Sequence, residues 1–207
     1  MKHRRNFQLI FIFALVVFQV QCVKQDKNLE DWTVQKRLDR GESIKEILEQ
    51  YQLHDVLGSE IEGGIIVHLD TKENTGLSIY PIPIVYDIPF GCGESFLQTE
   101  SIFGTGAENT EELVNICGTE ATAAYACDTL DINGYSDWFL PSSEELRSII
   151  ELLEFEKLFT DPTGTKYWSS TTWSLSDATY SSRGNSYGSN QSRDSTACVF
   201  AVRSFNF

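Results

Sequence analysis

The sequence predicts an α+β domain. Residues 63–69 and 77–80 are apolar strand-like runs that flank the turn-rich stretch 70–76, which is typical of a hairpin. A central block between residues 109 and 153 carries helical patterns, and residues 197–205 form a buried-type strand near the C-terminus. An early hairpin, central helices and a late strand together indicate the α+β class.

The first residues have the order of a secretory signal. Lys2, Arg4 and Arg5 are basic, and every residue from 9 to 18 is apolar. This apolar run has ten residues, whereas a membrane-spanning helix needs about 20. We therefore expect residues 1–21 to be a signal peptide and the protein to be exported to the cell envelope or the outer surface of a bacterium.

Cys22 follows the apolar run directly and leaves two alternatives open. A cysteine at this place can be the acylated first residue of a lipoprotein, which would hold the protein to a membrane. Gln21 and Gln19 depart from the usual residues before such a cysteine, so cleavage after Cys22 would instead give a freely secreted protein. Lipidation at Cys22 is the favoured alternative.

Residues 22–60 are polar and charged and are assigned to a helical spacer before a domain that covers residues 61–207. Ser43 and Glu46 form a capping-box pattern that opens a helix with Ile44, Ile47 and Leu48 on one side. The helices of this segment either pack on the domain, which is the favoured alternative, or form a stalk for oligomerisation.

Three helices are expected in the centre of the domain. Asn109 can cap a helix that runs to Cys117, and a second helix follows over residues 121–130. After an Asn-Gly turn at residues 133–134, Ser142 with Glu145 forms a capping box that opens a third helix reaching residue 153.

The segment from residue 169 to 196 is small and polar, with ten serines and four threonines. Such a composition is typical of disorder, but Trp173, Tyr180 and Tyr187 are spaced along it. The spaced aromatics predict short strands and loops that are held on a scaffold.

The formal charge of the chain is −14, and loss of the basic signal takes it to −17. A surface of this charge repels nucleic acid and sulfated polysaccharides at long range. Nucleic acid is therefore excluded as an expected partner.

Assigning Cys22 to the export signal leaves four cysteines. An even number in an exported chain predicts two disulfides, and three connectivities are open. The absence of a Cys-x-x-Cys pair in the sequence argues against a zinc knuckle or a thioredoxin-type redox site.

Three short patterns match catalytic or ligand-binding motifs, but the residues around each pattern argue against the function. Residues 184–188 match Gly-x-Ser-x-Gly, but no histidine follows to act as the base of a hydrolase. Residues 104–106 resemble a phosphate-binding turn, but glutamates crowd the helix that follows. Residues 128–137 hold a fragment of a calcium loop without its glutamate, and turn chemistry explains them. We expect no catalytic residue, metal or cofactor.

Several separated motifs resemble the Lcl C-terminal domain family, whose fold is similar to C-type lectins. In chain order they are Gly63-Gly64-Ile65-Ile66, Asn74-Thr75-Gly76-Leu77, Gly104-Thr105-Gly106-Ala107-Glu108-Asn109-Thr110, Asn133-Gly134-Tyr135-Ser136-Asp137-Trp138-Phe139-Leu140-Pro141-Ser142, Tyr167-Trp168-Ser169-Ser170 and Val202-Arg203-Ser204-Phe205. The resemblance implies short antiparallel strands, two or three helices, paired terminal strands and long polar loops displayed at one end. It also implies core positions for Trp138, Leu140 and Trp168.

The resemblance further implies disulfides between Cys92 and Cys117 and between Cys127 and Cys198, the second because similar folds bridge a helix to the late strand. The calcium-binding triplets of sugar-binding C-type lectins are missing from the sequence, so a calcium-dependent lectin site is not implied. Known adhesive members of the family bind sulfated glycosaminoglycans, which the negative charge of this chain opposes.

We therefore expect a non-enzymatic, adhesin-like surface module that binds an extracellular glycan or a surface protein through loops 171–196, with oligomers possible. One alternative is an oxidase of the formylglycine-generating type, which shares a related fold and needs a pair of reactive, copper-holding cysteines. The other is a structural envelope lipoprotein. The candidate ligand-binding residues are Trp173, Tyr180, Arg183, Tyr187 and Arg193.

Overall fold

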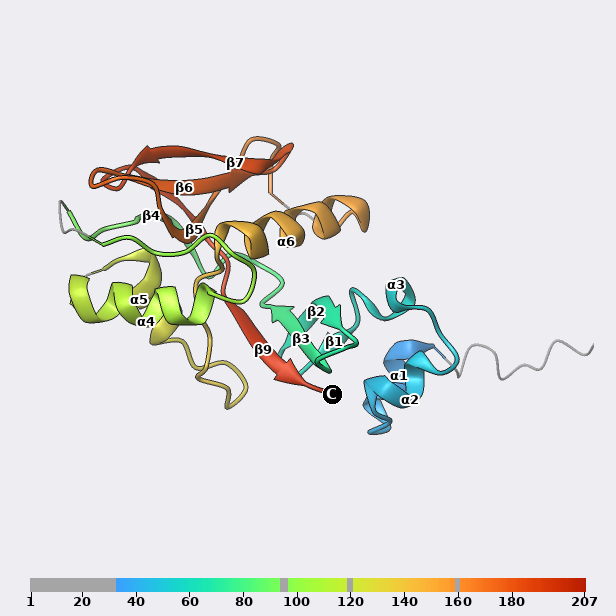
Figure 1. The fold of residues 1–207 in the computed structure, drawn as a ribbon. Helices are drawn as coiled ribbons and strands as arrows, with labels where there is room; N and C mark the ends of the chain where they lie inside the picture. Colours follow the sequence, from blue (N-terminus) through green and yellow to red (C-terminus); the bar gives the residue numbers. More distant parts are fainter. Residues whose placement is uncertain (1–32, 94–96, 119–120, 159–160) are drawn as a thin grey trace, which may run out of the picture. The chain divides into compact units, whose positions relative to one another are not determined.

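The computed structural model describes residues 33–93, 97–118, 121–158 and 161–207. Cys22 and the expected signal peptide lie outside the described residues. The described residues form an α+β fold, as predicted (Figure 1). Its helices are α1 (Val34–Asp39), α2 (Ile44–Leu48), α3 (Leu53–Val56), α4 (Gly106–Cys117), α5 (Ala123–Asp128) and α6 (Ser143–Phe155). Its strands are β1 (Glu60–Ile61), β2 (Gly64–Asp70), β3 (Thr75–Ile79), β4 (Val85–Pro89), β5 (Lys166–Thr172), β6 (Asp177–Ser182), β7 (Asn185–Ser192), β8 (Thr196–Val199) and β9 (Val202–Asn206).

The predicted hairpin is confirmed and belongs to a sheet with the order β1-β2-β3-β9. Neighbouring strands of this sheet are antiparallel, and β9 pairs with β3 from Thr75↔Asn206 to Ile79↔Val202. The C-terminal strand therefore returns beside the first hairpin of the domain, as the resemblance implies. Gly76 allows this close approach, because a Cβ atom there would overlap the ring of Phe205.

The second sheet has the order β4-β8-β5-β6-β7. Only the contact between β5 and β8, at Tyr167↔Cys198, is parallel among the pairings of the described strands. One hydrophobic core places α6 against the inner residues of β2, β3, β5 and β9. A second core lies around Trp138, Leu140 and Trp168 and includes α4, α5 and β8, so the predicted core positions of these three residues are confirmed.

The short strands predicted within residues 169–196 are confirmed, and they occupy most of the segment 171–196 in which binding loops were expected. β6 and β7 form a meander on β5, and buried hydroxyl groups make this possible in a serine-rich segment. Ser169 Oγ donates to the Thr179 carbonyl at 2.8 Å, and Thr172 Oγ1 accepts from the Thr99 amide at 2.9 Å. Because small hydroxyl side chains satisfy their hydrogen bonds inside the sheet, the composition that suggested loops is compatible with strands.

The helices before residue 61 belong to the same compact unit as the residues that follow them. Residues from Thr33 to Phe207 form one compact unit. Val34, Ile44 and Ile47 are buried against side chains of β2 and β9 in a third core cluster. The favoured alternative, in which these helices pack on the domain, is confirmed for the described part of residues 22–60.

The three central helices are confirmed, with one shifted start. α6 begins at the predicted capping box of Ser142 and Glu145. α4 begins at Gly106, with Thr105 at its N-cap, so the prediction that Asn109 caps it was wrong. Asn109 is instead buried inside the helix, where its side chain bonds a neighbouring segment. No helix among the described residues is long and apolar enough to cross a membrane.

Candidate binding site

Arg203 on β9 joins two of the motifs that carry the family resemblance. Its guanidinium forms a two-pronged ion pair with Asp137, in which Nη2 donates to Oδ2 at 2.9 Å, and Nη1 donates to Glu62 Oε2 at 3.1 Å. The same group lies 3.9 Å from the centre of the Tyr135 ring. The hydrogen bond from Arg203 lowers the pKa of Asp137 below its usual range. Arg203 therefore locks the 133–142 motif to the closing strand.

The Gly104-Thr105-Gly106 turn wraps around an internal carboxylate. Glu145 is 1% exposed and accepts from the Gly104 amide at 2.9 Å and from the Ser142 amide at 2.7 Å. Only glycine fits at position 106, because a Cβ atom there would overlap the Glu145 carboxylate. Burial raises the pKa of Glu145. The turn thus binds an anion of its own chain, and a phosphate is not needed to explain it.

Asn109 and Thr110 connect the remaining motifs. Asn109 Nδ2 donates to Ser170 Oγ at 3.0 Å, and its Oδ1 accepts from the Glu100 amide at 3.0 Å. Thr110 Oγ1 accepts from the Leu140 amide at 2.9 Å. Asn109 and Thr110 therefore use their polar side-chain atoms to hold the scaffold together.

Three of the five predicted ligand-binding residues are engaged inside the protein. Arg193 lies in the turn after β7, but its side chain is only 1% exposed, so the prediction that this side chain is displayed was wrong. Its Nη2 donates to the carbonyl oxygens of Ser174 at 2.6 Å and Leu97 at 3.4 Å. Tyr180 is half-buried between Trp168 and the Lys166 ammonium, and the Arg183 guanidinium donates to the Asp161 carbonyl.

Trp173 and Tyr187 are exposed, at 70% and 83%, but do not form one site. The Trp173 amide donates to the Asp177 carbonyl at the start of β6. Tyr187 lies near the opposite end, between the pairs Tyr180↔Ser189 and Ser182↔Asn185. Because a strand rises about 3.4 Å per residue, the two backbones are roughly 14 Å apart.

Trp173 borders a groove of about 220 Å³. The groove is lined by Leu97, Gln98, Thr172, Trp173, Ser174 and Leu175. None of these side chains is ionisable, and Leu175 is 51% exposed. Arg193 links the two walls of the groove, because its guanidinium donates to the Leu97 carbonyl on one wall and to the Ser174 carbonyl on the other. The result is a rigid, uncharged groove with an aromatic face and a few amide and hydroxyl groups.

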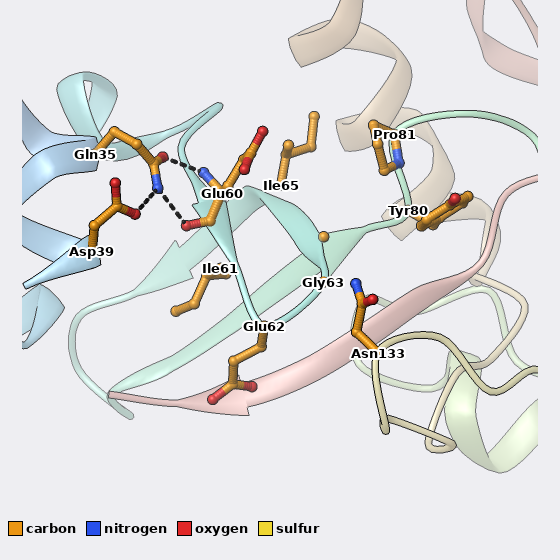
Figure 2. Close-up of a pocket in the computed structure, with 11 residues that line it drawn as sticks. Gln35, Asp39, Glu60, Ile61, Glu62, Gly63, Ile65, Tyr80, Pro81 and Asn133 are labelled. Carbon is orange, nitrogen blue, oxygen red and sulfur yellow. Dashed lines mark hydrogen bonds between the residues drawn. The ribbon is translucent and has the colours of Figure 1, made fainter. Parts of the chain in front are cut away.

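A larger groove of about 410 Å³ lies beside the first sheet (Figure 2). Its acidic side chains are Asp39, Glu60 and Glu62, and sequence reasoning missed it because Asp39 and Glu60 were assigned to the spacer. Gln35 Nε2 donates to Asp39 Oδ1 at 2.9 Å, and Gln35 Oε1 accepts from the Glu60 amide at 2.6 Å. Glu62 is paired with Arg203.

The smaller groove offers a ligand more unengaged surface than the larger one. The larger groove uses much of its polar lining for internal hydrogen bonds, and its aromatic residue, Tyr80, packs edge-on against Trp138. Trp173, in contrast, presents most of its surface to solvent beside a cavity. Tryptophan is enriched among the residues that contribute most of the binding free energy at interfaces.

The disulfide between Cys92 and Cys117 is confirmed, whereas the one expected between Cys127 and Cys198 is not formed. Successive residues of a strand face opposite sides of a sheet. Cys198 on β8 belongs to the core around α6, whereas Cys127 belongs to the core on the other side, with Val199. The two thiols therefore cannot meet.

Both free thiols are buried. Burial raises the pKa of both, and that of Cys198 to about 11. Such thiols stay protonated at neutral pH and are poor nucleophiles. Within the part of the chain that the structure describes, no group of three or more His, Cys, Asp or Glu side chains could hold a metal ion.

No protein-family model matches the chain, and no curated protein is significantly similar to it. The resemblance to the Lcl C-terminal domain family therefore rests on the motif residues themselves.

Proposed function

We propose that the protein is a non-enzymatic, exported binding module that recognises an uncharged glycan at the Trp173 groove. The observation that carries this proposal is the 70% exposure of Trp173 beside a cavity whose walls are fixed by Arg193. The apolar face of a sugar ring stacks well on an aromatic side chain, and the amide of Gln98 and the hydroxyl of Ser174 can bond its hydroxyl groups.

The choice of an uncharged ligand follows from the charge of the chain. The formal charge of −14 opposes sulfated or otherwise acidic polysaccharides. Of the two arginines in residues 171–196, Arg193 is buried and Arg183 is engaged with Asp161. A neutral hexose can approach the groove without an electrostatic penalty.

Two further observations support an exported member of the Lcl C-terminal domain family. The chain contains a disulfide, which is typical of oxidising compartments outside the cytoplasm. The last strand pairs with the first hairpin of the domain, as expected for a C-type lectin-like fold. Cys22 would anchor the mature protein to a membrane if it is acylated, and intact-mass measurement of the exported protein distinguishes this from free secretion.

A glycan array tests the proposal. The chain from residue 22 onward, with Cys22→Ser to remove the acylation site, is applied to an array of neutral and sulfated glycans. We expect binding to neutral glycans, with affinity reduced at least about tenfold by Trp173→Ala, since aromatic anchors contribute more than 1 kcal/mol. Tyr187→Ala is the matched control, because Tyr187 is also exposed, at 83%, but lies on β7 and does not line the groove.

Three outcomes would contradict the proposal. They are no binding to any neutral glycan, a preference for sulfated glycans, and binding that Trp173→Ala leaves unchanged. If the same groove bound a purified surface protein and no glycan on the array, the ligand would be a protein and not a glycan.

A further inference from the structure

The Trp173 groove has aliphatic side chains beside its aromatic face. Leu175 is 51% exposed and lies in a turn, which the Trp173 and Ser174 amides close by donating to the Asp177 carbonyl at 3.0 and 3.1 Å. Leu97 is half-buried and lies on the other wall. An unsubstituted hexose has one apolar face of C–H groups, which the tryptophan ring is able to cover. The two leucines therefore leave apolar surface for an aliphatic substituent of the sugar.

Gln98 supplies the amide side chain of the groove, and its backbone is held on both sides. The Leu97 carbonyl accepts from Arg193 Nη2 at 3.4 Å. The Thr99 amide donates to Thr172 Oγ1 at 2.9 Å. Gln98 itself is exposed, and none of the described residues forms a hydrogen bond with its side chain. Its two N–H donors and its acceptor oxygen are therefore available to an amide group of a ligand.

The groove offers no charge to an ionised sugar. Its six lining residues are uncharged. A free amino sugar carries an ammonium group that would need a carboxylate here, and a uronic acid would need a cation, because an unpaired charge is costly to desolvate. The formal charge of −14 further opposes acidic sugars. The lining therefore favours a sugar that is neutral and carries both an aliphatic and an amide group.

We propose that the Trp173 groove binds an acetamido sugar, which is a neutral N-acetylated hexosamine, as one unit of a neutral polysaccharide. The acetamido methyl group contacts Leu175 and Leu97, the acetamido amide bonds Gln98, and the sugar ring stacks on the tryptophan. The groove of about 220 Å³ is smaller than the roughly 300–1,000 Å³ of sites that enclose a whole small molecule, so it takes a single sugar unit. This inference rests on the proposed function and names the class of glycan bound at the same groove.

Isothermal titration calorimetry with matched ligands tests the inference. The chain from residue 22 onward, with Cys22→Ser, is titrated with the tetrasaccharides of chitin and of cellulose, which share one linkage and differ in the acetamido group. The methyl glycosides of N-acetylgalactosamine and galactose form a second pair. We expect the acetamido member of at least one pair to bind at least about tenfold more tightly, because the methyl group and the amide each add a contact.

Two substitutions separate these contacts. Gln98→Ala removes the amide, and Leu175→Ala removes most of the surface for the methyl group. Each should weaken binding of the acetamido member about three- to fivefold and leave binding of the hydroxyl member unchanged. Leu158→Ala is the matched control, because Leu158 is 41% exposed and does not line the groove. Circular dichroism checks that each variant is folded.

A further ligand distinguishes two sources of acetamido sugars. The glycan strand of peptidoglycan has the same acetamido groups as chitin but adds a carboxylate to every second sugar. Because the protein carries a formal charge of −14, this strand should bind more weakly than the chitin tetrasaccharide at low salt, and the difference should shrink as salt is added. Equal or tighter binding of the peptidoglycan strand at low salt would overturn the assignment to a neutral polysaccharide.

The remaining outcomes separate this inference from the proposed function. Equal affinity within both pairs, with Trp173→Ala weakening both members, would overturn the acetamido assignment and leave the neutral-glycan proposal intact. Absence of binding by any neutral glycan would overturn both. An acetamido preference that Gln98→Ala and Leu175→Ala leave unchanged would also overturn the assignment, because the preference would then come from another surface.

Discussion

Trp168 and Trp173 lie five residues apart, yet the first is fully buried and the second is 70% exposed. Trp168 donates from Nε1 to the Ile88 carbonyl at 2.9 Å and packs edge-on against Phe90. Trp173 follows the last residue of β5 and borders a groove. One end of the strand thus belongs to the scaffold and the other to the displayed surface.

The contrast between the two tryptophans separates residues that hold the fold from residues that a ligand can reach. Two residues that carry the family resemblance, Arg203 and Asp137, are engaged with one another. Residues of this kind specify a fold. The side chains that line the candidate groove lie outside these motifs, in residues 97–98 and 172–175, where function can change without disturbing the scaffold.

The largest expected effect is that of Trp168→Ala. Loss of a fully buried tryptophan leaves a cavity and an unpaired Ile88 carbonyl, and should lower the free energy of unfolding by about 3–5 kcal/mol. Urea denaturation followed by far-UV circular dichroism measures the change. A loss below about 1 kcal/mol would show that this end of β5 is not part of the rigid scaffold.

Arg203→Leu should come next, with a loss of about 2–3 kcal/mol. The substitution removes the ion pairs to Asp137 and Glu62, but both carboxylates are partly exposed and regain water, which limits the cost. Arg203→Lys keeps the charge but cannot bind Asp137 with two prongs, and should recover part of the loss. Equal stability of the leucine variant and the unsubstituted protein would contradict the assigned role of Arg203.

Acid should weaken the same contact. The pKa of Asp137 is lowered in the folded protein by the hydrogen bond from Arg203. Its contribution is therefore present above the unfolded pKa of about 3.9 and is lost as pH falls through the folded pKa. Because Asp137 is more than half exposed, we expect Asp137→Asn to reduce the stability difference between pH 6 and pH 3 by less than about 1 kcal/mol. If Asp137→Asn left the stability difference between pH 6 and pH 3 unchanged, groups other than Asp137 would account for the acid sensitivity.

Local sequence patterns predicted much of the scaffold. The Ser142 capping box and the hairpin at β2 and β3 follow from residue types at short spacing, whereas the core position of Trp138 was implied by the family resemblance. Such patterns depend on neighbours within a few residues, which the sequence displays directly.

The features that sequence reasoning missed depend on distant partners. Arg193 is buried because the carbonyl of Leu97, far away in the sequence, accepts its hydrogen bond. Cys127 and Cys198 fail to pair because they lie on opposite sides of β8. Composition made residues 171–196 resemble loops, although Ala178 and Ser181 are buried in β6.

Trp173→Ala tests the separation of scaffold and surface most directly. The free energy of unfolding and the affinity for a neutral glycan found on the array are measured on the same sample. We predict a change in stability of less than about 0.5 kcal/mol, as for surface substitutions, together with at least about a tenfold loss of affinity. A loss of stability comparable to that of Trp168→Ala, or full affinity in the variant, would contradict the account.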